Sequence, residues 1–281
     1  MSSYRVIVLT TLAMLAFAGN SLLCRVALKD TGIDAASFTS IRMSAGALTL
    51  WLLLRLRAGR SSGGGNWLSA LALFGYAAAF SFAYVSLSAA TGALLLFGAV
   101  QMSMISWGLF KGERMRGPQL AGLALALAGL VGLLLPGLSA PPLAGALLMI
   151  GAGVSWGVYS LRGKGAGDAT RVTAGNFLRT VPIALLMSLA SMAWLGEARL
   201  DAAGAGYALA SGALASGVGY AIWYTALPAL KATHAATVQL SVPVIAALGG
   251  VVFLGEALGV RAVLAAAAIL GGIALVIIEK R

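Results

Sequence analysis

The feature that most constrains the fold is a run of about 20 apolar residues that recurs along the whole chain. A helix of roughly this length crosses the hydrocarbon core of a bilayer. Only 10% of the residues are charged and 60% are hydrophobic, too few charges to cover a soluble surface. We therefore predict an all-α integral membrane protein with ten transmembrane helices. The runs lie near 4–26, 35–56, 67–87, 92–110, 118–136, 141–161, 173–196, 205–227, 233–254 and 259–278.

The first run could imitate a signal peptide. Similar runs recur to the C-terminus, however, and "FAGNSLLCR" is a poor cleavage site, so we interpret the first run as a retained span.

Basic residues orient the chain, because cytoplasmic connections carry an excess of Lys and Arg. Thirteen of the 19 basic residues face the cytoplasm if the N-terminus does, whereas Arg25, Lys29, Arg199 and Arg261 lie on the other side. The net charge of +11 then calls for no nucleic-acid partner. We expect a multi-pass protein of the bacterial cytoplasmic (inner) membrane with both termini in the cytoplasm.

Metal and redox chemistry find little support in the composition. Cys24 is the single cysteine and His234 the single histidine, so an internal disulfide and a thiol-ligated metal site are both excluded. We expect no cofactor. Since no catalytic pair is apparent either, we do not expect an enzyme.

The two halves of the chain resemble each other. "FTSIRMSAGALTL" aligns with "AGNFLRTVPIALLM", which matches Arg42 to Arg179, and the segment after Glu113 aligns with the segment after Glu256. Each half holds five spans, an odd number, so the second half must be inserted upside down. We predict two inverted five-helix repeats, 1–137 and 138–281. Inverted repeats around a midplane site are typical of alternating-access transporters.

The chain also resembles the drug/metabolite transporter superfamily in its ten-helix form, built from two EamA domains. The resemblance covers essentially the whole chain and is carried best by "ATHAATVQLSVPVIAALGGVVFLGEALGVRAVLAAAAILGGIALVI". The first helix departs from the family's Trp-Gly-Ser-Asn pattern, because it has Phe17 and Asn20 in "FAGNSLL". The resemblance implies a function like that of the bacterial amino-acid exporters of this superfamily, which include the YddG-like aromatic amino-acid exporters.

The charged residues narrow the substrate class. All eight acidic residues lie in connections or at span ends, which disfavours the intramembrane carboxylate relay of proton-driven drug efflux. Phosphate groups would call for paired cations in the cavity, yet Arg42 and Arg179 are the only basic residues that lie more than two residues inside a span. We therefore favour an exporter or facilitator of amino acids or similar small metabolites. Multidrug efflux and nucleotide-sugar or sugar-phosphate transport remain the alternatives.

A substrate path can be predicted from neutral polar residues and aromatic rings. Tyr76, Phe80 and Tyr84 share one helix face, and Phe80 and Tyr84 align with Tyr220 and Tyr224 of the second half. Such a lining suits a zwitterion with an apolar side chain, although membrane aromatics also form interface belts and Ser or Asn can join helices. The predicted substrate-binding residues are Asn20, Ser21, Phe80, Tyr84, Gln101, Trp107, Ser155, Trp156, Tyr220, Trp223, Tyr224 and Gln239.

Four further residues are candidates for gating. Pro243 frees the carbonyl of residue 239 and predicts a hinge or a static kink, and His234 titrates near neutral pH. Arg42 and Arg179 each lie near a span end. We favour the interpretation that each side chain reaches toward the membrane edge and binds nearby carbonyls there. The alternative is that the two arginines close the path alternately.

Small residues recur at four-residue spacing in the fifth and tenth spans and permit close helix contact. We expect these two spans to form a peripheral scaffold. The expected partners are a small-molecule substrate and the lipid bilayer, and the expected assembly is a monomer or a weak homodimer.

Overall fold

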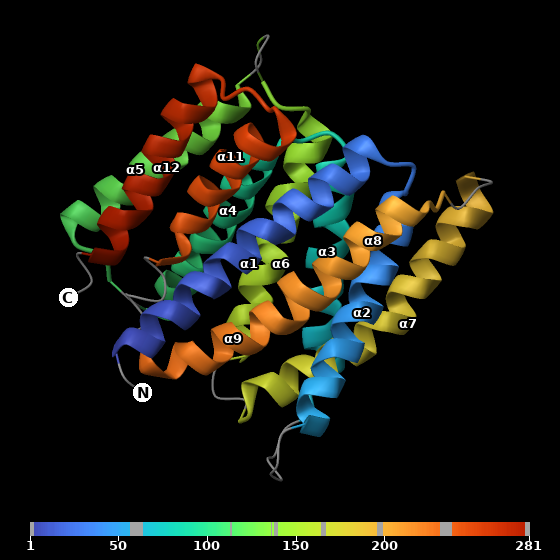
Figure 1. Cartoon of the computed structure of the whole chain (residues 1–281). Helices are drawn as coiled ribbons and strands as arrows, with labels where there is room; N and C mark the ends of the chain where they lie inside the picture. Colours follow the sequence, from blue (N-terminus) through green and yellow to red (C-terminus); the bar gives the residue numbers. More distant parts are fainter. Residues whose placement is uncertain are drawn as a thin grey trace.

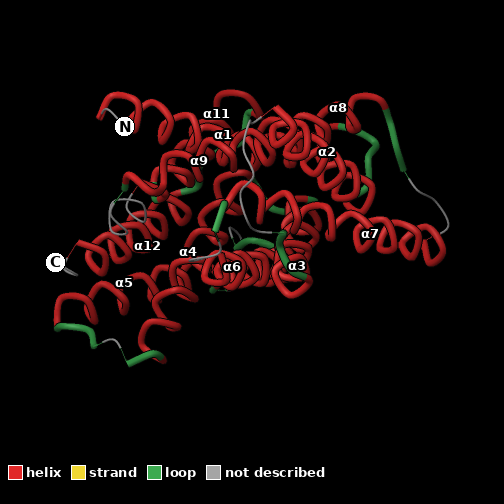
Figure 2. The backbone as a smooth tube through the Cα atoms, turned by 90° about the horizontal axis from the view of Figure 1, so that it is seen from below, coloured by secondary structure: helices red, strands yellow, loops and turns green. Residues whose placement is uncertain are grey.

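The computed structural model describes residues 3–56, 64–112, 114–135, 137, 140–163, 167–195, 199–230 and 238–278. Within these ranges the secondary structure is helical, with turns and no strand (Figure 2). The long helices are α1 Ser3–Asp30, α2 Ala35–Leu56, α3 Trp67–Tyr84, α4 Ala89–Phe110, α5 Gly117–Leu134, α6 Leu143–Gly163, α7 Ala169–Leu195 and α12 Val260–Ile278. The shorter elements are α8 Ala202–Ala210, the π-helix η1 Ser211–Val218, α9 Gly219–Ala226, the 3₁₀ turn η2 Leu227–Ala229 and α11 Ser241–Leu254.

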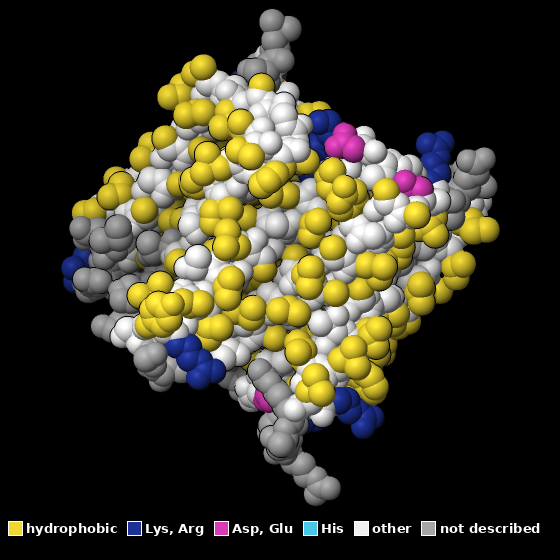
Figure 3. Space-filling model, in the orientation of Figure 1, with side chains coloured by type: hydrophobic (Ala, Val, Ile, Leu, Met, Phe, Trp, Pro, Cys, Tyr) yellow, Lys and Arg dark blue, Asp and Glu magenta, His cyan; other side chains and the backbone are white. Residues whose placement is uncertain are grey.

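These helices confirm the predicted all-helical membrane fold class. Among the described residues, eight helices are long and apolar enough to cross a membrane, and α11 is a shorter apolar helix. The predicted eighth span is one continuous helical rod, α8–η1–α9, whose backbone stays in the right-handed helical region at both junctions. Hydrophobic side chains cover the middle of the face in Figure 3, and Lys and Arg lie toward its rim.

Helix ends follow local sequence signals. Asn66, Ser88 and Asp201 cap α3, α4 and α8, because each side-chain oxygen accepts a hydrogen bond from a backbone N–H three residues on. The helix α11 ends at Gly255, whose φ of 60° lies in the left-handed region that glycine adopts without strain.

Small residues allow the closest helix contacts. The helices α5 and α12 pack side by side (Figure 1), and a Cβ at Gly122 would lie 2.6 Å from the carbonyl oxygen of Gly272. Neighbours of α5 other than α12 are few. This placement agrees with the expectation that the fifth and tenth spans form a peripheral scaffold.

The helices α2 and α7 pack against each other in opposite directions. At the start of α2, the Asp34 carboxylate accepts a hydrogen bond from the N–H of Arg199, which follows α7. At the other end, Asn176 near the start of α7 accepts a hydrogen bond from the N–H of Asn66, which follows α2. An inverted repeat requires corresponding helices, here α2 and α7, to run in opposite directions.

Other helix contacts also occur in corresponding pairs. By chain order in the two predicted repeats, α1, α3 and α4 correspond to α6, the rod α8–η1–α9 and α11. The pair α3–α6 corresponds to the rod α8–η1–α9 packed on α1, and the pair α4–α6 corresponds to α11 packed on α1. The pair α3–α7 corresponds to the same rod packed on α2. This pattern supports our proposed division of the chain into repeats 1–137 and 138–281.

Candidate functional site

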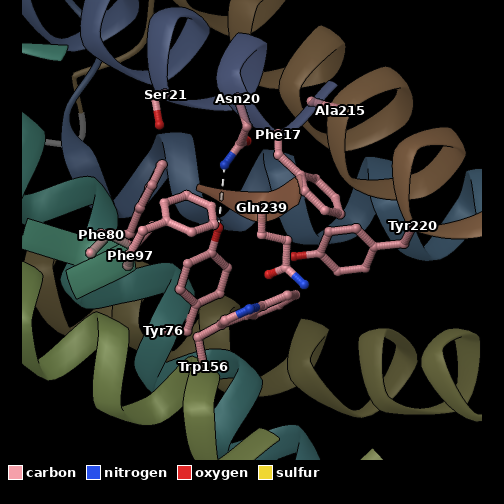
Figure 4. A pocket seen from close by; sticks show the side chains of 11 residues that line it. Phe17, Asn20, Ser21, Tyr76, Phe80, Phe97, Trp156, Ala215, Tyr220 and Gln239 are labelled. Carbon is pink, nitrogen blue, oxygen red and sulfur yellow. Dashed lines mark hydrogen bonds between the residues drawn. The ribbon is translucent and has the colours of Figure 1, made fainter. Parts of the chain in front are cut away.

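A small cavity lies between the two halves of the molecule, where α1, α3, α4, α6 and the rod α8–η1–α9 converge (Figure 4). Its free space is about 20 Å³, room for roughly one water molecule. Side chains from both predicted repeats contribute to the wall. The lining residues are Phe17, Asn20, Ser21, Tyr76, Phe80, Leu96, Phe97, Trp156, Ala215, Tyr220 and Gln239.

Helical periodicity brings these side chains to one place. On α1, Phe17, Asn20 and Ser21 are spaced by three and four residues, and on α3 Tyr76 and Phe80 are spaced by four. Residues at these spacings share a helix face. Each of these two helices therefore presents a mixed aromatic and polar face to the cavity.

Aromatic rings form most of the wall. The ring centroids of Tyr76 and Trp156 lie 4.8 Å apart, and those of Trp156 and Tyr220 lie 5.2 Å apart. The Phe17 ring meets Tyr220 edge-on at 5.7 Å, and Phe80 lies 5.4 Å from Tyr76. These spacings are those of attractive ring pairs. The cavity is therefore bounded by a chain of rings in mutual contact.

Polar groups complete the wall. The Asn20 amide donates to the Tyr76 hydroxyl at 3.3 Å, as Figure 4 shows, and its oxygen accepts from the Ser211 hydroxyl at 2.7 Å. The amide of Gln239 points into the cavity in the same view. Hydrogen-bonding groups buried within a membrane protein are costly and mark substrate paths more often than polar groups elsewhere.

Arg42 lies directly behind this wall, and its position corrects the favoured sequence interpretation. The side chain does not reach the membrane edge, because it is fully buried with 0% exposure. Its guanidinium donates from Nε to the Ser216 hydroxyl at 3.3 Å and from Nη2 to the Tyr76 hydroxyl at 3.1 Å. The guanidinium carbon lies 5.3 Å from the Tyr76 ring centre and 5.0 Å from that of Phe80.

Close packing explains why Arg42 stays inside. A Cβ at Gly212 in η1 would collide with the backbone carbonyl of Arg42, so the rod presses directly on α2 at this level. π-Helical segments occur often at functional sites. Two serines of η1 bind polar groups here. The Ser211 hydroxyl donates to the Asn20 amide oxygen, and the Ser216 hydroxyl accepts from the Arg42 guanidinium.

Arg179, the counterpart of Arg42 in the second half, is placed differently. Its Nη1 donates to the backbone carbonyls of Gly64 and Gly175 near the end of the bundle. This arrangement matches the interpretation that an arginine near a span end binds local carbonyls. The two aligned arginines therefore have different surroundings.

Polar contacts close the molecule on both sides of the cavity. One turn beyond Ser21 and Phe80, the Arg25 guanidinium pairs with Glu256 at 3.0 Å and donates to the carbonyl of Tyr84 at 2.8 Å. We call this the Arg25 end. At the opposite end, the Asn176 amide donates to the Tyr159 hydroxyl at 3.4 Å. There Arg162 also binds Ser69 and Asn66, and we call this the Arg162 end.

Half of the predicted substrate-binding residues meet at the cavity, namely Asn20, Ser21, Phe80, Trp156, Tyr220 and Gln239. The others do not line it. Trp107 is 46% exposed and stacks on Phe110 at the end of α4, and Ser155 faces Gly75 between α3 and α6. The remaining four are the buried Tyr84, Gln101 and Trp223 and the half-buried Tyr224.

The gating candidate Pro243 stands apart from the cavity. Pro243 lies in the first turn of α11 and lines a separate apolar pocket, while the helix is interrupted at Leu240, just after Gln239. His234 lies outside the described residues.

Several lining residues were absent from the sequence prediction. Phe17 could have been found, because it shares a helix face with Asn20 and Ser21. Tyr76 shares the face of Phe80 in the same way. Leu96, Phe97 and Ala215 have no distinguishing sequence signal, since an apolar residue in a span can face lipid, another helix or a cavity.

Comparisons with known proteins agree with this architecture. A sequence model of the EamA-like transporter family matches residues 143–278, within the second predicted repeat. The "uncharacterized protein PA1977" of Pseudomonas aeruginosa is 59% identical over 281 residues, covering 100% of this chain and 97% of that protein. An "uncharacterized transporter" of Archaeoglobus fulgidus is 28% identical over 255 residues, 85% of this chain and 86% of that one.

A solved crystal structure of another protein shows the same fold. It superposes with a TM-score of 0.67 at 21% sequence identity and covers 100% of this chain and 99% of its own. Together with the apolar helices and the matched family model, these likenesses confirm the predicted EamA resemblance. The chain carries an EamA-like transporter family domain over residues 143–278.

Proposed function

We propose that this transporter moves neutral amino acids, aromatic ones among them, out of the cell by alternating access through the central cavity. The observation that carries the proposal is the lining itself. Rings of Phe17, Tyr76, Trp156 and Tyr220 surround amide and hydroxyl groups at the junction of the two predicted repeats. Rings accommodate an apolar side chain and attract an ammonium group, and the amides supply hydrogen bonds to a zwitterion.

The closed ends support an alternating-access mechanism. Polar contacts tie the helices together at both the Arg25 end and the Arg162 end, and the free space of about 20 Å³ is smaller than any amino acid. Substrate entry therefore calls for one end to separate while the cavity expands. In an inverted repeat, the same movement in the other half opens the opposite end.

Charge placement supports transport without an obligatory proton. The described acidic residues Asp30, Asp34, Asp168, Asp201 and Glu256 lie at helix ends or in connections, and none of them lines the cavity. Multidrug efflux by an intramembrane carboxylate relay is therefore less favoured. We also propose that the Arg25 end faces away from the cytoplasm in the bacterial inner membrane, because basic residues concentrate toward the other side.

The test is uptake of labelled Thr, Met and Phe into proteoliposomes, with and without an imposed pH gradient. We expect saturable uptake of at least one of the three without a gradient, because the cavity lining is neutral. Empty liposomes and the Trp156→Ala variant serve as controls. Absence of uptake for all three would overturn the amino-acid proposal, and uptake only with a gradient would overturn the facilitated mechanism.

A further inference from the structure

Arg42 is a buried cation whose described partners are all uncharged. No described carboxylate lies within salt-bridge distance of its guanidinium. Nε and Nη2 each donate to a hydroxyl group, while Nη1 has no hydrogen-bond partner among the described residues. An arginine in a protein keeps its proton, so the site carries a full positive charge next to the cavity.

A charge in this position requires an explanation. Buried charges in membrane proteins are costly, and they are normally paired or serve function. The faces of Tyr76 and Phe80 offset part of the cost through cation–π attraction. They leave the Nη1 donor unused. Arg179 gives the contrast, because its Nη1 is already committed to two backbone carbonyls.

Tyr76 adds a second available donor. Its hydroxyl oxygen accepts hydrogen bonds from both Asn20 at 3.3 Å and Arg42 at 3.1 Å, so neither bond uses the hydroxyl hydrogen. Tyr76 also lines the cavity, whereas Arg42 lies behind it. The two residues together place an unused guanidinium donor beside an unused hydroxyl donor, a pair suited to a carboxylate.

We propose that Arg42 and Tyr76 bind the carboxylate of the transported amino acid. The inference deepens and rests on the proposed function. The aromatic rings around Trp156 and Tyr220 would receive the rest of the molecule. Because the rings of Tyr76 and Phe80 stand between the guanidinium and the free space, carboxylate binding requires these rings to move. Substrate binding is thereby linked to rearrangement of α3 against α2.

The decisive comparison is between an amino acid and its carboxamide, which lacks only the anionic group. Binding is measured as thermal stabilisation of the purified full-length protein, using the best substrate of the uptake panel and its amide. We expect the wild type to prefer the acid by about a hundredfold, the scale of losing one partner of a buried charge pair. Equal affinity for acid and amide overturns the inference while leaving amino-acid transport standing.

Two substitutions of Arg42 test whether its guanidinium causes the preference for the acid over the amide. Arg42→Met should abolish the preference for the acid, and its own melting temperature should not fall, because an unpaired buried charge has been replaced by an apolar chain of similar length. Arg42→Lys should keep part of the preference. Arg179→Met is the matched control and should retain the full preference.

The outcomes separate the two proposals. If the wild type takes up none of the amino acids, the proposed function fails and the inference falls with it. If uptake persists but Arg42→Met still prefers the acid, the inference alone fails. A lower melting temperature of Arg42→Met together with an unchanged preference assigns Arg42 a purely structural role and also overturns the inference.

Discussion

The Arg25 guanidinium and the Glu256 carboxylate lie 3.0 Å apart, although 231 residues separate them in the chain. Glu256 also accepts a hydrogen bond from the N–H of Ala89 at the start of α4, and Arg25 donates to the carbonyls that end α3. One ion pair therefore joins α1, α3, α4 and the end of α11. It closes the cavity on one side and links the two predicted repeats.

Glu256→Gln should loosen the Arg25 end. The single amide oxygen can still accept from Ala89, so the substitution removes the charge that faces Arg25 and the hydrogen bond that Arg25 donates to the second carboxylate oxygen. We expect reaction of a cysteine at the cavity position Ala215, in a Cys24→Ser background, with an impermeant thiol reagent to accelerate about tenfold. That factor equals about 1.4 kcal/mol, between the values of exposed and buried ion pairs.

Arg199→Gln is the control for this experiment, because Arg199 is an exposed basic residue at the same end. It removes one charge of opposite sign at the same end and should leave the labelling rate unchanged. A labelling rate of Glu256→Gln equal to that of the parent would show that the ion pair does not hold this end closed.

Gly122→Ala should destabilise the fold, because the added methyl group would lie 2.6 Å from the Gly272 carbonyl and 2.9 Å from the Leu275 side chain. Overpacking of this kind costs about 1–3 kcal/mol. The measurement is the melting temperature of the purified protein in detergent. Gly132→Ala on the same helix, where a Cβ meets nothing within 4 Å, should leave the melting temperature unchanged or raise it. Equal effects of the two substitutions would contradict the observed α5–α12 packing.

Trp156→Ala and Trp107→Ala should affect transport differently. Trp156 contacts the rings of Tyr76 and Tyr220 in the cavity wall, whereas Trp107 is exposed at the end of α4. Loss of the Trp156 ring, which also contacts Tyr159, removes aromatic surface that the substrate would contact. A ring contact of this kind is worth about 0.5–1.5 kcal/mol, so KM should rise by up to about tenfold. Trp107→Ala should keep KM within about twofold of the wild type. Initial uptake rates over a substrate series check both values, and a larger effect at Trp107 would place the path elsewhere.

Asn176→Ala should loosen the Arg162 end. The Asn176 side chain is buried, accepts a hydrogen bond from the Asn66 N–H at 2.9 Å and donates to the Tyr159 hydroxyl. Its loss should cost about 1–3 kcal/mol and lower the melting temperature. Hydrogen exchange of the peptide containing Asn66 should accelerate. Asn176→Asp keeps the acceptor for Asn66 and should restore slow exchange, and fast exchange in both variants would assign the effect to the lost Tyr159 contact.

The fold class could be predicted from the sequence because it depends on length and polarity. A backbone in lipid must satisfy its own hydrogen bonds, so each long apolar run becomes a helix. The faces that carry Asn20 with Ser21, or Tyr76 with Phe80, follow from helical periodicity alone. The ninth span is a further example, since the helix is interrupted at Leu240, directly after Gln239, the residue whose carbonyl Pro243 leaves without a helical hydrogen bond.

Which polar or aromatic residue faces the cavity was decided only by the tertiary structure. Trp156 and Trp107 look alike in sequence, yet one lies in the wall and the other on the surface. The aligned Arg42 and Arg179 diverge for a similar reason. The glycine at 212 lets the π-helical segment press on α2, so Arg42 is enclosed by Ser216 and Tyr76. Arg179 instead has the backbone carbonyls of Gly64 and Gly175 within reach of its guanidinium. Sequence determined the membrane helices and their faces, whereas the contacts between helices, which depend on residues far apart in the chain, decided what each face meets.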